Sequence, residues 1–278
     1  MIHTHIDSRR RWFRWDLPEL WRYRDLALLF ARKSLKTTYA QTLLGPLWLV
    51  LSPLLSSFVY LLLFNRVARL GTDGAPELLF YLTGTAAWGF FSACFQSNAQ
   101  IFTANAQLFG KVWFPRLTVP LGNLLTALVK FAVQLLPALA LMVWHWAHGT
   151  IRPDGWACLL LPLTLLQLAL LGLGCGLILS SLTAKYRDLS ALVPVGTQLW
   201  MYATPVVYPL SVIPAGTLRR FVLWNPATAG LELLRRALLG VGTVEPRTLA
   251  AAWAVTIAVL LLGLALFHRV ERTVMDTI

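Results

Sequence analysis

The sequence predicts an all-α polytopic membrane protein with six transmembrane helices. Of its 278 residues, 57% are hydrophobic and only 13% are charged, and the mean hydropathy is +0.64. Soluble globular domains hold about 45–50% apolar and about 25% charged residues. A water-soluble chain of this size could not bury so much apolar surface, so disorder, a coiled coil and an ordinary globular enzyme are excluded.

Six long stretches are almost free of charged residues, and a membrane-spanning helix needs about 20 apolar residues. Lipid offers no partner for backbone amides, and the stretches lack the alternation of barrel strands, so all six should be helical. We expect a cytoplasmic segment over residues 1–40 and a transmembrane domain over residues 41–278. The spans are predicted at about 42–65, 77–101, 117–146, 156–183, 189–208 and 248–268.

Basic residues indicate the orientation. Lys and Arg concentrate in the N-terminal region, at 111–116 and 185–187, and after the last span, where they outnumber those on the opposite side. Because cytoplasmic loops carry an excess of Lys and Arg, both termini are predicted to be cytoplasmic. The formal charge of +12 would suggest a nucleic-acid partner for a soluble protein. Here orientation and anionic lipid account for it, so no nucleic acid is expected.

An amphipathic helix is predicted along the membrane surface over residues 16–40. Asp16 and Glu19 resemble a capping box, and Pro18 suits the first turn. At about 100° per residue, charged side chains gather on one face and apolar ones on the other. The charged face holds Arg22, Asp25, Arg32, Lys33 and Lys36, and the apolar face holds Leu20, Tyr23, Ala27, Phe30 and Ala31. Such a helix either anchors the chain to the bilayer or docks a cytosolic partner, and both interpretations stay open.

Prolines interrupt the chain repeatedly between the fifth and sixth predicted spans. Proline lacks a backbone donor and disfavours helical geometry at the residue before it. The amphipathic pieces between these breaks are too short to span a bilayer. They are predicted to form two short helices that enter the outer leaflet and return, the alternative being ordinary external loops. The residues that define this pattern are Pro205, Tyr208, Pro209, Pro214, Asn225 and Pro226.

Motifs for catalysis or cofactor binding are lacking. Gly110-Lys111 has neither the upstream glycine nor the following Ser or Thr of a phosphate-binding loop, so the chain is not expected to bind ATP by that route. The spans contain essentially no acidic residues on which a proton relay could run. No catalytic residue, bound cofactor or metal ion is therefore predicted.

Three groups of residues imitate binding motifs but are better explained by packing or by the membrane interface. The glycines suit close helix packing, the histidines lack a third ligand and sit beside interfacial tryptophans, and the cysteines have no paired spacing. The residues are Gly172, Gly174 and Gly176; His145 and His148; and Cys94, Cys158 and Cys175.

Two features inside the spans point to a substrate. Lys130 lies about 16 Å into the third span at about 1.5 Å per residue, where it could attract a lipid-linked diphosphate or cap carbonyls in an internal cavity. Aromatic rings in the second and fifth spans suit sugar rings, although interface belts contain the same residue types. The candidate substrate path is Trp88, Phe91, Phe95, Lys130, Trp200 and Tyr202.

The cytoplasmic loop at 105–116 is too polar to continue the second span, yet it is rich in Phe and Trp. Such rings need a cover. A short helix pressed into the groove of a partner would supply one.

An ordered series of short motifs resembles the permease subunits of ABC-type polysaccharide exporters, the ABC-2 type, over about residues 20–240. Each motif is weak alone, and their order makes the resemblance specific. The O-antigen branch is nearest, because the aromatic-Phe-Pro-Arg and Tyr-Arg-Asp motifs are particularly like it. The series comprises Leu20 to Leu26, Lys36 to Trp48 with Pro53, Asn105, Leu108, Lys111 to Arg116, Tyr186-Arg187-Asp188, Gln198 to Met201, Thr204 to Pro209, Pro214 and Asn225-Pro226.

The resemblance implies a homodimeric conduit in the bacterial inner membrane, served by two copies of a separate ATPase that holds ATP and Mg. Its substrate would be a glycan on undecaprenyl diphosphate. Residues 103–113 would form the coupling helix, 20–36 the interface helix and 209–240 the periplasmic gate region. The implied ATPase contacts are Arg22, Arg24, Leu108, Phe109, Lys111 and Trp113. Lys130 is not part of the matched pattern.

Three other functions remain in view. Export of teichoic acid or capsular polysaccharide is the first. A membrane enzyme acting on lipid-linked glycans predicts acidic or nucleophilic clusters, of which only the Tyr186-Arg187-Asp188 loop offers one carboxylate. An ion-coupled transporter predicts buried acids and an inverted repeat, and neither is found.

Overall fold

The computed structural model describes residues 17–40, 42–112, 114–186 and 188–275. Within these ranges the chain contains helices and loops but no strand, which confirms the all-α class. The α-helices are α1 Leu17–Arg22, α2 Arg24–Tyr39, α3 Trp48–Tyr60, α4 Glu77–Ala99, α5 Ile101–Ala104, α6 Ala106–Phe109, α7 Thr118–Ala147, α8 Gly155–Leu159, α9 Leu161–Thr183, α10 Leu189–Tyr202, α11 Thr217–Trp224, α12 Pro226–Leu239 and α13 Pro246–Met275.

Five segments among the described residues are helical, long and apolar enough to cross a membrane. They are Gly45–Val67, α4, α7, α9 and residues Pro246–Glu271 of α13. The first joins a 3₁₀ turn at Gly45–Leu47, α3, and a π-helical stretch at Leu61–Val67. The predicted span at 156–183 is divided instead at Leu160, between α8 and α9, because Pro162 lacks a backbone donor and suits the first turn of a new helix.

The predicted fifth span at 189–208 is shorter than expected. Helix α10 ends at Tyr202 after 14 residues, a length of about 21 Å at 1.5 Å per residue. The expectation that the helix would reach residue 208 is wrong, because Pro205 and Pro209 cannot donate to the carbonyls of a preceding turn.

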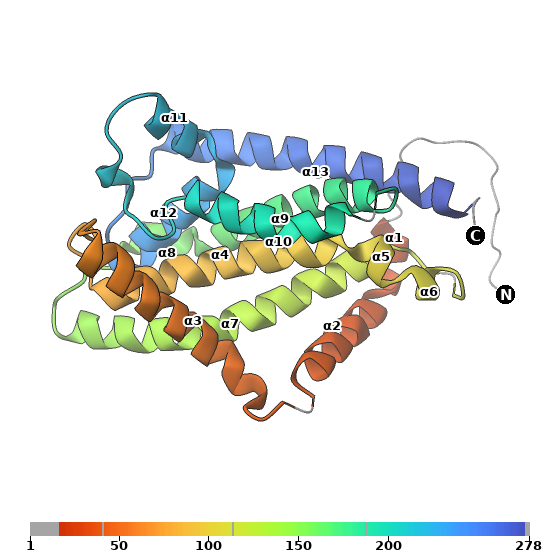
Figure 1. Cartoon of the computed structure of the whole chain (residues 1–278), viewed down its shortest axis with the longest axis horizontal. Coiled ribbons are helices and arrows are strands. Elements are labelled where there is room, and N and C mark those ends of the chain that lie inside the picture. The colour runs from red at the N-terminus through yellow and green to blue at the C-terminus, as the bar shows by residue number, and fades with distance from the viewer. Residues whose placement is uncertain (1–16, 41, 113, 187, 276–278) are drawn as a thin grey trace.

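Figure 1 shows the long helices side by side, with α4 in the middle of the group. Helices α3, α7 and α10 run in one direction along the molecule, and α4, α9 and α13 run in the other. Helices α1, α5, α6 and the C-terminal part of α13 lie toward one end, and α8, α11 and α12 lie toward the other. Helix α4 packs against α3, α7, α9, α10 and α12, so it forms the centre of the core.

Glycines on α9 explain how tightly the central helices pack. A methyl group on Gly172 would lie 2.8 Å from Cβ of Cys94, and one on Gly176 would lie 2.6 Å from Cβ of Asn98, both on α4. Gly174 meets α13 instead, where a methyl group would lie 2.8 Å from Cα of Leu260. These contacts confirm the prediction that the three glycines serve helix packing, as small residues do in membrane bundles.

The predicted amphipathic helix at 16–40 is two helices. The chain breaks at Tyr23, between α1 and α2, and Asp16 lies outside the described residues. The two predicted faces are confirmed: Ala27 and Ala31 are buried, whereas the predicted charged side chains are all exposed. Helix α2 lies on α7 because Gly122 offers no side chain; a methyl group there would lie 2.9 Å from Cβ of Phe30.

The loop after α4 also departs from the expectation of one helix over 103–113. Two short helices, α5 and α6, meet at Asn105, and helix α6 ends at Phe109. The Asn105 side chain donates to the carbonyl of Ile101 at 3.0 Å. This local bond lets the backbone leave the helix at Asn105, as Asn side chains commonly do.

Candidate gate, conduit and coupling sites

The segment after α10 is fixed by Arg235 of α12. Nη1 of Arg235 donates to the carbonyl of Pro205 at 2.5 Å, and Nη2 donates to the carbonyl of Val206 at 2.6 Å. Buried carbonyls need partners, and here no continuing helix supplies them. Val206 and Val207 are fully buried beside them. Arg235 therefore fixes the segment at 203–209, here called the gate segment. It supplies the hydrogen bonds that a continuing helix would otherwise have made.

Arg235 itself lies deep in the bundle, with 1% of its surface exposed. Its Nη1 is 3.3 Å from Oε1 of Glu232, and its guanidinium carbon is 3.7 Å from the centre of the Phe80 ring. Oε2 of Glu232 accepts from the backbone amide of Thr243 at 3.0 Å. A methyl group on Gly84 would lie 2.9 Å from Nη2 of Arg235, so α4 needs a glycine there.

Sequence reasoning missed both members of this pair. Glu232 and Arg235 are three residues apart on a helix whose other inward residues are mostly apolar. Two ionisable residues at that spacing in a buried helix are a signal for a paired internal charge, because unpaired charges are not tolerated there. That signal was available in the sequence.

Asn225 connects the gate segment to the aromatic rings of α10. Its Oδ1 accepts from Nε1 of Trp200 at 3.3 Å and from the amide of Ala227 at 3.2 Å, while its Nδ2 donates to Oγ1 of Thr204 at 2.8 Å. Asn225 thus caps α12, and Pro226 occupies the first helical position that favours proline. The predicted Pro214 is exposed, ahead of α11.

An ion pair ties α8 to the exposed side of α12. Oδ2 of Asp154 lies 2.8 Å from Nε of Arg236, and Oδ1 of Asp154 accepts from the amide of Trp156 as the cap of α8. The hydrogen bond from the Arg236 guanidinium is the largest influence on Asp154 and holds the pKa of its carboxyl below the ordinary value. The same region fixes the end of α12, where Gly240 adopts a φ of +75°.

Four predicted path residues form one aromatic cluster. The Trp200 ring of α10 lies edge-on to Phe91 at 4.9 Å, Phe95 at 6.1 Å and Trp88 at 6.2 Å between ring centres. Phe91 is 0% exposed, so these rings cover one another in this arrangement. A sugar could stack on Phe91 only if α10 moved away from α4.

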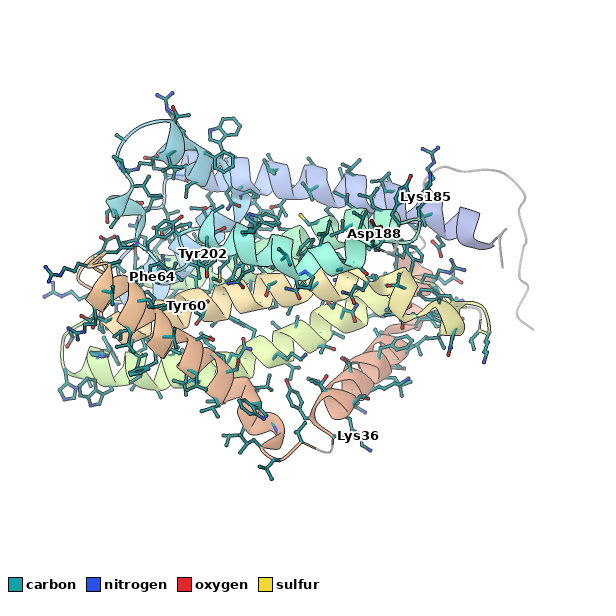
Figure 2. All side chains as sticks on the ribbon, in the orientation of Figure 1. Lys36, Tyr60, Phe64, Lys185, Asp188 and Tyr202 are labelled. Atoms are coloured by element: carbon teal, nitrogen blue, oxygen red, sulfur yellow. The ribbon has the colours of Figure 1, made fainter. Side chains whose placement is uncertain are left out.

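Tyr202 belongs to a second group, which is open to the surroundings. Nε2 of Gln198 donates to its hydroxyl at 3.3 Å, and the hydroxyl of the predicted Tyr208 donates to its carbonyl at 3.0 Å. The hydroxyl of Tyr60 contacts Sδ of Met201 at 3.8 Å, and Figure 2 shows Tyr60, Phe64 and Tyr202 on the same side of the molecule.

This group borders a cavity of about 350 Å³ between the end of α10 and α11, which Tyr202, Tyr208 and Phe221 help to line. The sequence analysis did not single out Tyr60 or Phe64, and it named Gln198 only as part of the motif series behind the family resemblance. Two aromatic residues four apart, and therefore on the same face of the first span, were the available signal for Tyr60 and Phe64.

Lys130 is half-buried on α7. Among the described residues, none of the hydrogen bonds or ion pairs involves its ammonium group. Its neighbour Phe131 packs on Phe90 of α4, with ring centres 5.1 Å apart. Its suggested contact with a diphosphate therefore stays a prediction.

A chain of aromatic rings runs through the predicted coupling region. Phe30 of α2 contacts Phe114 at 5.8 Å, Phe114 contacts Phe109 of α6 at 5.8 Å, Phe109 contacts Phe102 of α5 at 6.2 Å, and Phe102 stacks on Phe267 of α13 at 4.9 Å. Rings at these separations attract one another beyond their buried area. The cover that the sequence analysis sought for Phe109 in a partner is supplied in part by the chain itself.

Arg116 joins the same region to the last helix. It is 5% exposed, and its guanidinium lies 5.1 Å from the centre of the Phe109 ring. Its Nη1 donates to the carbonyl of Glu271 at 3.1 Å, and its Nε is 3.8 Å from Oε1 of that residue. Nδ1 of His268 lies 3.3 Å from the other carboxylate oxygen. The loop before α7 and the end of α13 are therefore one packed unit.

The other predicted coupling residues lie on the surface or partly so. Arg22, Arg24 and Lys111 are exposed, Leu108 is half-buried, and Trp113 lies outside the described residues. Exposed basic side chains are available to an external partner. Within the described part of the chain, no group of three or more His, Cys, Asp or Glu side chains could hold a metal ion.

Comparison with known proteins decides the family. The family described as "ABC-2 type transporter" matches this chain over residues 26–239. The chain belongs to the ABC-2 type transporter family. This confirms the resemblance seen in the ordered motifs, and it places the chain among transporters rather than membrane enzymes.

Three similar proteins illustrate the relationship. An O-antigen export system permease protein RfbA of Klebsiella pneumoniae is 28% identical over 247 residues, covering 89% of this chain and 92% of that protein. The RfbA protein of Myxococcus xanthus is 33% identical over 205 residues, covering 74% and 76%. The polysialic acid transport protein KpsM of Escherichia coli is 26% identical over 250 residues, covering 90% and 94%.

Proposed function

We propose that this chain is the conduit-forming permease subunit of an ATP-driven polysaccharide exporter. The observation that carries the proposal is the family match across residues 26–239 together with relatives named as O-antigen export permeases. The proposed substrate is an O-antigen-like glycan on undecaprenyl diphosphate. A capsular polysaccharide is the second candidate, because the similarity to the polysialic acid transport protein extends over 90% of the chain; teichoic acid is the third.

The proposed topology has six passes through the bacterial inner membrane, with both termini in the cytoplasm. Five segments have the required length and composition, and α10 runs across the bundle in the same sense as α3 and α7. We assign α10 and the segment up to Pro209 jointly to the fifth pass. Backbone that leaves a helix at membrane depth is tolerated where protein covers it, and here Arg235 and the buried Val206 and Val207 do so.

A homodimer is proposed as the conduit. The first span is only 17% buried, and α10 exposes Leu192, Val195 and Leu199. These two helices flank α4 on one side of the bundle. One copy buries its central side chains against one another, so a path as wide as a sugar is best formed between two such faces related by a twofold axis.

Energy is proposed to come from two copies of a separate ATPase, which would hold ATP and Mg. The exposed basic face of α1 and α2 and the exposed residues of α6 lie toward the same end of the molecule. They are the proposed interface helix and coupling segment. Helices α11 and α12 at the opposite end are the proposed periplasmic gate, since α12 is buried among α4, α8, α9 and α13 and can follow their movements.

Reconstitution tests this proposal. The chain and its ATPase are purified together, placed in liposomes, and supplied with lipid-linked glycan and ATP, and glycan that reaches the lumen is measured. We expect transport that requires both proteins and stops with a non-hydrolysable ATP analogue. Nucleotide hydrolysis, bond cleavage or ion-gradient dissipation by the purified chain alone would contradict it.

A further inference from the structure

An apolar groove lies between α7 and α9, on surface that the proposed conduit and gate do not use. Its volume is about 820 Å³. Leu128 of α7 and Leu166 of α9 line its sides, and Phe90 of α4, which is 3% exposed, lines its deepest part. At one end Trp21 and Arg24 of α1 and α2 complete the lining. Among the described residues that line the groove, Arg24 alone is charged.

The size and chemistry of the groove suit a flexible hydrocarbon chain. Ligand pockets in proteins usually measure about 300–1,000 Å³. This one is formed almost entirely by leucine, alanine, proline and aromatic side chains. Within a bilayer such a recess does not stay empty, because packed contact with its walls is favourable and lipid chains surround it.

The cation at the end of the groove selects among lipids. The Arg24 side chain is 58% exposed, and its only ion pair among the described residues is a distant one with Asp25 at 3.9 Å. Its guanidinium lies 5.3 Å from the centre of the Trp21 ring, which is itself 70% exposed. Tryptophan and arginine together at the end of an apolar recess match the level of lipid head groups.

We propose that this groove binds one acyl chain of an anionic phospholipid, with the lipid phosphate against Arg24. A chain gains little by leaving the bilayer for an equally apolar groove, so the head group decides which lipid is held. Along their whole length, α1 and α2 carry more basic than acidic residues: Arg22, Arg24, Arg32, Lys33 and Lys36 against Glu19 and Asp25. A basic residue near the surface contributes about 1 kcal/mol toward anionic lipid, which is about fivefold in affinity.

The lipid would fill the gap between the proposed interface helix and the bundle. Helix α2 packs on α7 where Phe30 and the backbone of Ala27 approach Gly122, and Leu20, Trp21, Arg24, Ala27 and Leu28 line the groove. The bound acyl chain would therefore pack between the bundle and the side chains of α1 and the first turns of α2. The groove is a separate site from the path proposed for the glycan.

Photo-cross-linking tests the site. The full-length protein is placed in nanodiscs that contain phosphatidylcholine and a small fraction of phosphatidylglycerol with a diazirine in one acyl chain. Cross-linked peptides are then identified by mass spectrometry. We expect labelling to concentrate on α7 residues 121–128 and α9 residues 162–169, and phosphatidylcholine carrying the same diazirine to label them about fivefold less.

Two matched pairs of variants sharpen the test. Leu166→Trp fills the groove and should abolish this labelling, whereas Leu163→Trp, at an exposed position on the same helix outside the groove, should leave it intact. Arg24→Gln should reduce the preference for phosphatidylglycerol about fivefold, and Arg22→Gln should not.

Other results would overturn the proposal. Equal labelling by the two phospholipids, or equal effects of Arg22→Gln and Arg24→Gln, would mean that general surface charge explains lipid binding. Unchanged labelling in Leu166→Trp would mean that the chain lies elsewhere. Displacement of labelled phosphatidylglycerol by a stoichiometric amount of polyprenyl phosphate would assign the groove to the carrier lipid, and cross-links from position 166 to a second copy would assign it to a protein interface.

Discussion

Arg235→Met removes the donor that holds the gate segment. The variant leaves Glu232, which is 4% exposed, as an uncompensated buried charge, and it leaves the carbonyls of Pro205 and Val206 without their partner. Removing one partner of a buried ion pair typically costs about 3–5 kcal/mol. Each orphaned carbonyl adds about 1–3 kcal/mol unless the segment moves to find another donor.

Because relaxation recovers part of that cost, we expect a destabilisation of about 4 kcal/mol for Arg235→Met. Arg235→Lys keeps the charge but cannot reach two carbonyls with a planar fork, so we expect about 1–3 kcal/mol. Arg236→Met is the matched control, since its ion pair with Asp154 is partly exposed, and such pairs contribute little to stability.

The assay is reversible unfolding in mixed detergent micelles, followed by tryptophan fluorescence. Accessibility of Val207→Cys to a maleimide gives a second readout, because position 207 is fully buried and should be labelled only when the segment is released. Adding Glu232→Gln to Arg235→Met should restore about 2 kcal/mol by removing the stranded charge. If the stability of Arg235→Met lies within about 0.5 kcal/mol of the parent and position 207 stays protected from the maleimide, Arg235 does not hold this segment in place.

Four further perturbations follow from the other contacts. Arg116→Gln should release Glu271, at the end of α13, from the loop before α7 and cost about 1–3 kcal/mol, seen as faster amide exchange over residues 264–271 with Lys111→Gln as the unaffected control. Gly176→Val should cost at least about 1–3 kcal/mol through the clash with Asn98, whereas Gly196→Val, with no atom within 4 Å, should not lower the melting temperature comparably. The pKa of Asp154 is lowered in the folded protein, so the stability that its ion pair contributes is complete above the unfolded-state pKa of about 3.9 and is lost as the pH falls through the folded-state pKa. Asp154→Asn should therefore reduce the dependence of stability on pH at acid pH. An unchanged dependence would mean that this ion pair is not its cause. If the proposed function holds, Phe109→Ala with Trp113→Ala should let the partner hydrolyse ATP without moving glycan, and undiminished transport in the double variant would remove these residues from coupling.

Much of the helical arrangement could be predicted from the sequence. Five spans lie close to their predicted limits because hydrophobic length is a strong signal in membrane proteins. The α9 glycines and the two faces of α2 were also predicted correctly, since both depend on helical spacing alone. The membership of the family followed from the order of motifs rather than from any one of them.

Breaks and tertiary partners were harder to predict. The segment after α10 depends on Arg235, a residue 33 positions beyond Tyr202. The Arg235 side chain donates to two backbone carbonyls of this segment, which are buried and have no helical partner. Helices α5 and α6 separate at Asn105 because a single side chain competes with the backbone ladder. The partner of Phe109 could not be identified locally, because its neighbour Phe114 also contacts α2 and Phe102 reaches α13.

Helix α13 gives the molecule a mechanical connection from end to end. It runs from Pro246 to Met275 with no proline after its first position, and its length is about 45 Å. The C-terminal part of α13 contacts the loop before α7 through the Arg116–Glu271 ion pair and contacts α5 through the stacked rings of Phe267 and Phe102. The helix also packs on α11 and α12. A displacement of the loop before α7 would therefore be transmitted along this continuous helix to the opposite end of the molecule, with no proline kink on the way to absorb it.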